Sequence, residues 1–79
     1  MKYSITVTLK KDVLDPQGKV VENTLKNMGL NSLKSVRQGK YFEIEVDEKN
    51  EKVADKEVTQ MCEKLLANLI IEDYKINKL

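Results

Sequence analysis

The 79-residue sequence has no histidine, no tryptophan and one cysteine, Cys62. A disulfide within the chain is therefore excluded, and a cysteine- or histidine-based metal site is not expected. Nucleophilic catalysis by a Ser–His or Cys–His pair is excluded as well, because both pairs need an imidazole. Cys62 falls on the apolar stripe of a predicted helix, which indicates a buried structural thiol. We expect no catalytic residue, no cofactor and no metal in this chain.

The sequence also lacks an excess of charge and a long apolar run. Fourteen Lys and Arg residues stand against thirteen Asp and Glu residues, so the formal net charge is +1. This balance disfavours nucleic-acid binding, which needs a clear basic excess. The longest apolar segment, residues 65–71, is too short to span a membrane, and no signal peptide is visible. With one unpaired cysteine, these features predict a soluble cytoplasmic protein.

The short length predicts a single domain, residues 1–79, with a small core. A core of this size rarely supplies more than about 3–5 kcal/mol of stability, and natural proteins of this length usually add disulfides, a metal or a partner. Since the first two are not expected, self-association is the predicted reinforcement. Both a dimer and a tetramer are compatible with the sequence.

The hydrophobic pattern predicts the order β-α-β-β-α-β. Alternation predicts strands and helical spacing predicts helices, while Asp15 and Pro16 provide the cap and first residue of the first helix. The second strand is the weakest, because Leu33 and Val36 fall on opposite faces. It is joined to the third strand by a tight hairpin turn at Gly39 and Lys40. The predicted elements are a strand at 3–10, a helix at 16–28, strands at 32–38 and 41–47, a helix at 51–67 and a strand at 70–77.

This order is that of a ferredoxin-like α+β fold. Right-handed crossovers place both helices on one face of an antiparallel sheet, with strand order 4-1-3-2. The fold hosts many functions and identifies none of them.

Two polar motifs admit more than one interpretation. The segment DPQG at residues 15–18 resembles an anion site, but a capped helix start is favoured, because Asp15 occupies the end that an anion needs. Glycine in a first helical turn lowers the stability of the helix, so the local sequence does not explain why residue 18 is glycine. Close approach of a partner's backbone would explain it. The predicted turn carries Arg37 and Lys40, which could bind a phosphate or an acidic partner.

Three segments together resemble the PurS family, the small subunit of phosphoribosylformylglycinamidine synthase in purine biosynthesis. They are LKKDVLDPQGKVVENTLKNMG at residues 9–29, VRQGKYFEIEV at 36–46 and MCEKLLANLIIEDYKI at 61–76. Leu69 is a departure, since relatives often carry proline at that position.

The resemblance implies a subunit without an active site of its own in an ATP-dependent amidotransferase ligase. A large subunit would use ATP and magnesium to activate formylglycinamide ribonucleotide, and a glutaminase subunit would release ammonia from glutamine. The small subunit would assemble the other two. The matching positions are candidate subunit-interface residues: Asp15, Pro16, Gln17, Gly18, Arg37, Gly39, Lys40, Asn68, Glu72, Asp73 and Tyr74. The alternative hypothesis is a ferredoxin-like regulatory module that binds a small effector at a dimer interface. A third hypothesis, which the charge balance disfavours, is weak nucleic-acid binding.

Overall fold

The first strand, β1 (Lys2–Leu9), is the centre of a three-stranded antiparallel sheet in the computed structural model, which describes residues 1–79. β2 (Gly39–Glu45) pairs with one of its edges and β3 (Glu72–Lys78) with the other, so the order is β2-β1-β3. Ile5 lies opposite Phe42 on β2 and Ile76 on β3. Because directly paired residues share a face of the sheet, the apolar side chains of all three strands point to the same side.

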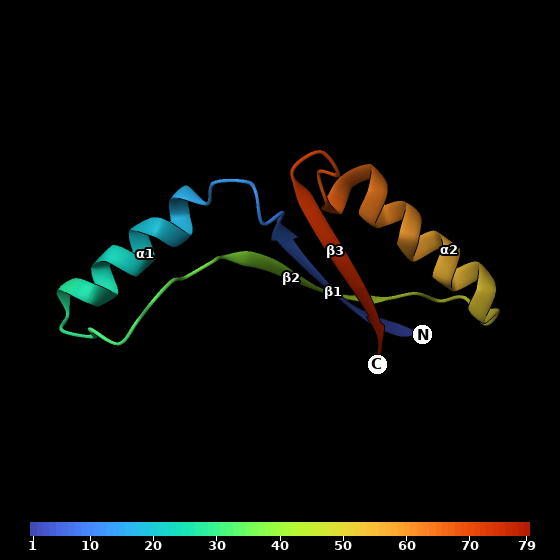
Figure 1. The fold of residues 1–79 in the computed structure, drawn as a ribbon. Helices are drawn as coiled ribbons and strands as arrows, with labels where there is room; N and C mark the ends of the chain where they lie inside the picture. Colours follow the sequence, from blue (N-terminus) through green and yellow to red (C-terminus); the bar gives the residue numbers. More distant parts are fainter.

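Helix α2 (Glu51–Met61) packs on that apolar side of the sheet (Figure 1). Asn50 caps it by accepting hydrogen bonds from the backbone N–H groups of Lys52 and Val53, at 3.0 and 3.2 Å. The chain continues into one π-helical turn, η1 (Cys62–Leu66). The buried apolar residues form one cluster: Tyr3, Ile5, Val7, Val46, Ala54, Val58, Cys62 and Ala67.

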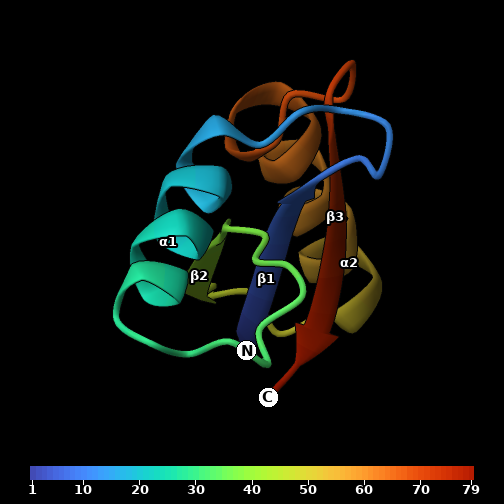
Figure 2. The ribbon, with the colours of Figure 1, turned by 60° about the vertical axis from the view of Figure 1, so that its left-hand side comes forward.

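Helix α1 (Pro16–Asn27) lies beyond the end of the sheet, and the chain runs back beside it to reach β2 (Figures 1 and 2). We call residues 16–38 the arm. The arm makes the molecule long, with extents of 51 × 25 × 14 Å and a radius of gyration of 16.1 Å. A compact domain of this length would have a radius of gyration of about 12 Å. The single chain is therefore extended, not compact.

The α+β class, with two helices and an antiparallel sheet, is confirmed. The predicted neighbours of the first strand are also correct, since β3 and β2 are the strands expected at 70–77 and 41–47. The second predicted helix, expected over 51–67, divides into α2 and η1.

The strand predicted at residues 32–38 is absent, and with it the hairpin: Gly39 and Lys40 begin β2. Two backbone N–H groups of this segment bind side chains instead of a neighbouring strand. The N–H of Val36 donates to Glu22 at 3.2 Å, and that of Gln38 donates to Asp15 at 2.7 Å. These bonds hold the segment against α1, away from the sheet. The expectation that both helices cover one face of the sheet is wrong for α1 in the single chain.

Candidate docking site at the root of the arm

The carboxylate of Asp15 holds the root of the arm together. One of its oxygens accepts a hydrogen bond from the N–H of Gly18 at 2.9 Å, and the other accepts from the N–H of Gln38 at 2.7 Å. The predicted helix cap is thus confirmed, with Pro16 as the first helical residue. Asp15 also joins the two ends of the arm. The N–H of Gln38, followed by that of Gly18, favours the ionised carboxylate and lowers the pKa of Asp15 below its ordinary value of 3.8.

Gly18 is buried where the returning chain crosses the first turn of α1. A Cβ at this position would lie 2.5 Å from a carboxylate oxygen of Asp15 and 2.8 Å from the carbonyl oxygen of Val36. No side chain fits at such distances without a shift of the backbone. The close approach that explains this glycine is therefore made by the chain's own backbone, which gives Gly18 a structural reason that the sequence did not supply.

Arg37 fastens the loop after β1 to the arm. Its Nη2 donates to the carbonyl oxygens of Lys10 at 2.9 Å and Val13 at 3.1 Å, and lies 3.5 Å from that of Leu9. A guanidinium suits this task because its several donors have a fixed geometry. Arg37 thus belongs to the internal structure of the root.

Glu22 is the buried charge of the arm, and the sequence interpretation missed it. Its side chain accepts the hydrogen bond from Val36 and forms ion pairs with Lys19 at 3.2 Å and Lys26 at 3.3 Å. Lys19, followed by Lys26, lowers the pKa of Glu22 below its ordinary value of 4.5. The spacing of three and four residues on a helix was a visible signal for the ion pairs, whereas the contact with Val36 was not.

Six of the candidate interface residues, drawn from three separate segments, line one hollow of about 400 Å³. We call it the root hollow. Across the end of β1, Nζ of Lys40 lies 3.5 Å from a carboxylate oxygen of Glu72, and Nε2 of Gln38 donates to Oε1 of Gln17 at 3.1 Å. The hollow is lined by Val7, Leu9, Asp15, Pro16, Gln17, Gln38, Gly39, Lys40 and Glu72. Of these, Val7, Leu9 and Gln38 were not among the predicted site residues.

Three of the remaining candidates lie near β3 and do not line the root hollow. Asn68 forms the turn before β3: its side chain accepts from the N–H of Ile70 at 3.1 Å, and its own N–H donates to Glu72 at 2.7 Å. Asp73 pairs with Lys10 at 3.5 Å. Tyr74 packs against the core, and burial raises its pKa.

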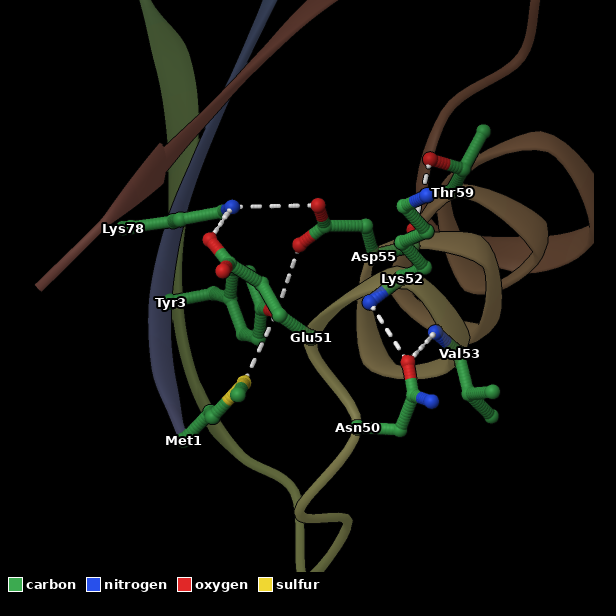
Figure 3. Close-up of polar contacts among 9 residues, drawn as sticks. All are labelled: Met1, Tyr3, Asn50, Glu51, Lys52, Val53, Asp55, Thr59 and Lys78. Carbon is green, nitrogen blue, oxygen red and sulfur yellow. Dashed lines mark hydrogen bonds and ion pairs between the residues drawn. The ribbon is translucent and has the colours of Figure 1, made fainter.

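A second polar cluster lies at the opposite end of the sheet and ties β3 to α2 (Figure 3). The hydroxyl of Tyr3 donates to Asp55 at 2.7 Å, and Nζ of Lys78 pairs with Asp55 at 3.0 Å and with Glu51. The hydrogen bond from Tyr3, followed by that from Lys78, lowers the pKa of Asp55. Every group in this cluster has a partner within it, which indicates a structural role.

Burial raises the pKa of Cys62, so its thiol is protonated and inert at neutral pH. No group of three or more Asp, Glu, Cys or His side chains could hold a metal ion. None of the helices has both the length and the apolar character needed to cross a membrane.

By its fold, this chain is a small α+β protein with an antiparallel sheet and a helical arm. The family model described as PurS, phosphoribosylformylglycinamidine (FGAM) synthase, matches residues 2–79. The FGAM synthase subunit PurS of Bacillus subtilis is 49% identical over 74 residues, which cover 94% of this chain and 87% of the relative. The chain belongs to the PurS family.

Solved structures agree with this assignment. A crystal structure of Bacillus subtilis PurS superposes with a TM-score of 0.87 at 47% identity, covering 96% of this chain and 94% of the other. A chain in the structure of PurLQS from Thermotoga maritima superposes with a TM-score of 0.89 at 33% identity, covering 99% of this chain and 95% of the other.

Proposed function

We propose that this chain is the small, non-catalytic subunit that assembles an FGAM synthase from separate glutaminase and synthetase subunits. The observation that carries the proposal is the full-length match to a chain in PurLQS of Thermotoga maritima, with a TM-score of 0.89. The synthetase would use ATP and magnesium to activate formylglycinamide ribonucleotide, and the glutaminase would supply ammonia. This chain would keep the two together in the cytoplasm and would associate with copies of itself, as a dimer or a tetramer.

The root hollow is the proposed docking site for one of these two subunits. Its shape is fixed, because Asp15 and Arg37 tie the arm, the loop and β2 together. Gln17 and Gln38 present an amide pair that can extend hydrogen bonds to a partner's backbone. Lys40 is half-exposed and offers a cation to a carboxylate. A rigid polar hollow of this kind suits recognition of a loop on another protein, because little ordering is needed on binding.

The assembly role can be tested by measuring the masses of the complexes that the three subunits form. The synthetase and glutaminase subunits of the same organism are mixed with and without this chain, in the presence of nucleotide and glutamine, and analysed by size-exclusion chromatography with light scattering. We expect a complex that contains all three chains, and no joint complex of the two large chains when this one is omitted. A synthetase–glutaminase complex that forms equally well without this chain would overturn the proposal.

A further inference from the structure

The longest apolar run of the sequence, residues 65–71, ends in a turn that the fold does not bury. Of this run, only Ala67 belongs to the core. The three apolar residues at its end are exposed to different degrees: Leu69 by 46%, Ile70 by 85% and Ile71 by 38%. We call residues 68–71 the apolar turn. It precedes β3, at the end of the sheet from which the arm leaves (Figure 1). Adjacent exposed apolar residues, unlike single ones, mark interaction sites.

The backbone of the apolar turn is fixed by hydrogen bonds. The side-chain oxygen of Asn68 accepts from the N–H of Ile70 at 3.1 Å. The backbone carbonyl oxygen of Asn68 accepts from the N–H groups of Ile71 at 3.1 Å and Glu72 at 2.7 Å. The carbonyl oxygen of Ile71 accepts from the N–H of Lys10 at 2.9 Å, at the end of β1. Ile70 thus has a fixed backbone and a β-branched side chain that is stiff at χ1, so it loses little conformational entropy on binding.

The carboxylate of Glu72 joins the apolar turn to the root hollow. One of its oxygens accepts from the N–H of Asn68 at 2.7 Å, and the other lies 3.5 Å from Nζ of Lys40. The side chain of Glu72 is only 13% exposed, so the carboxylate is an internal link between the two features. The root hollow itself is mostly polar, with Val7 and Leu9 as its hydrophobic residues. A polar hollow next to an exposed apolar side chain resembles a protein interface, in which an apolar contact is surrounded by polar groups.

The charges beside the apolar turn are balanced. Lys10 pairs with Asp73 and Lys40 pairs with Glu72, both at 3.5 Å. The turn therefore carries no excess charge that would attract a partner on its own. Affinity at Ile70 would come from the removal of its side chain from water, and this requires an apolar pocket on the partner.

We propose that Ile70 is the apolar anchor of the docking surface, and that its side chain enters an apolar pocket of the same large subunit that occupies the root hollow. In that subunit, the pocket lies beside the acidic group that meets Lys40. The occupant is a large subunit and not a second copy, because Glu72 makes the turn and the hollow one continuous surface. This inference rests on the assembly role proposed above and adds the residue that supplies the apolar contact.

Ile70→Asp tests the anchor, and Leu79→Asp is its matched control. Leu79 follows β3 at the opposite end of the sheet and is 69% exposed, so it receives the same change away from the root hollow. The concentration of small subunit that gives half of the three-chain complex should rise at least ~10-fold for Ile70→Asp, since a buried isoleucine contributes more than that factor to affinity. It should be unchanged for Leu79→Asp and for the conservative Ile70→Val. The Tm should not change in any variant, because both side chains are exposed.

Cross-linking identifies the chain that covers Ile70. Ile70→Cys, Lys40→Cys and the control Lys56→Cys are labelled with a benzophenone maleimide, and the native Cys62 is buried and does not react. After irradiation of the three-chain complex, Ile70→Cys and Lys40→Cys should be joined to the same large subunit, as identified by mass spectrometry. Lys56→Cys should be joined to neither large subunit.

The outcomes separate this inference from the assembly role. Failure of the wild-type chain to form a three-chain complex would overturn the assembly role, and the anchor with it. A wild-type complex that Ile70→Asp forms equally well would overturn the anchor alone. So would a cross-link from Ile70→Cys only to a second copy, to the other large subunit or to no chain, when Lys40→Cys is joined to a large subunit.

Discussion

Replacing Gly18 by alanine is expected to lower the free energy of unfolding by about 1–3 kcal/mol, which is the usual cost of forcing extra atoms into a packed site. The added Cβ would meet a carboxylate oxygen of Asp15 and the carbonyl oxygen of Val36 at distances that real contacts do not reach. Relief requires the returning chain to move away from α1, which also breaks the bond between Asp15 and Gln38. Thermal denaturation followed by circular dichroism should show a fall in Tm of roughly 10 °C.

Gln17→Ala is the matched control for this substitution. Gln17 precedes Gly18 in the same helical turn, is exposed and makes one side-chain hydrogen bond, to Gln38. An exposed alanine in a helix should change the free energy of unfolding by no more than about 0.5 kcal/mol. An unchanged Tm for Gly18→Ala would show that the chain does not pass so close to the helix, and contact with another subunit would again be the better explanation of this glycine.

Arg37→Glu should impair folding, whereas Lys40→Glu should leave folding intact and impair assembly. Arg37 donates to backbone carbonyl oxygens of the loop after β1, so a carboxylate at this position faces other acceptors and should open the root of the arm. Lys40 makes one half-exposed ion pair, of a kind that contributes little to stability. We therefore expect a clear fall in Tm for Arg37→Glu and almost none for Lys40→Glu.

Lys40→Glu should instead reduce glutamine-dependent FGAM formation by about tenfold at limiting concentrations of the small subunit, the usual effect of losing one charged contact at an interface. Ammonia-dependent formation should be unchanged, because it does not need the glutaminase to be docked. Lys56→Glu, an exposed cation on α2 away from the root hollow, is the control of equal charge and should behave as wild type. Equal activity of Lys40→Glu and Lys56→Glu would remove the root hollow from the assembly surface.

Local patterns in the sequence predicted most of the elements. The alternation in β1 and the Asp–Pro start of α1 are signals carried by neighbouring residues, and both are correct. The strand expected at 32–38 is wrong, because its N–H groups bind Glu22 and Asp15, which are 14 and 23 residues away from their donors. Leu33 and Val36 on opposite faces were the one local sign of this outcome. The position of α1 could not be predicted, since the rule for crossovers assumes that a helix packs on its own sheet.

The sequence predicted which residues belong to the candidate site but not how they are arranged in space. The family resemblance supplied Gln17, Lys40 and Glu72 from separate segments, and the structure brings them to one hollow. It also gives internal roles to Gly18 and Arg37, which the sequence offered only as interface candidates. Gln38 was missed because its importance comes from a backbone N–H and an amide contact, and neither depends on a recognisable motif.

The most direct test of the assembly role is FGAM formation by the purified synthetase and glutaminase, with glutamine or with ammonia as the nitrogen source, before and after this chain is added. If this chain joins the two subunits, the synthetase should use ammonia at the same rate in both cases. Glutamine-dependent formation should be close to background without this chain and should rise to saturation as the chain is added. Full glutamine-dependent activity in its absence, or no rise when it is added, would contradict the assembly role of this chain.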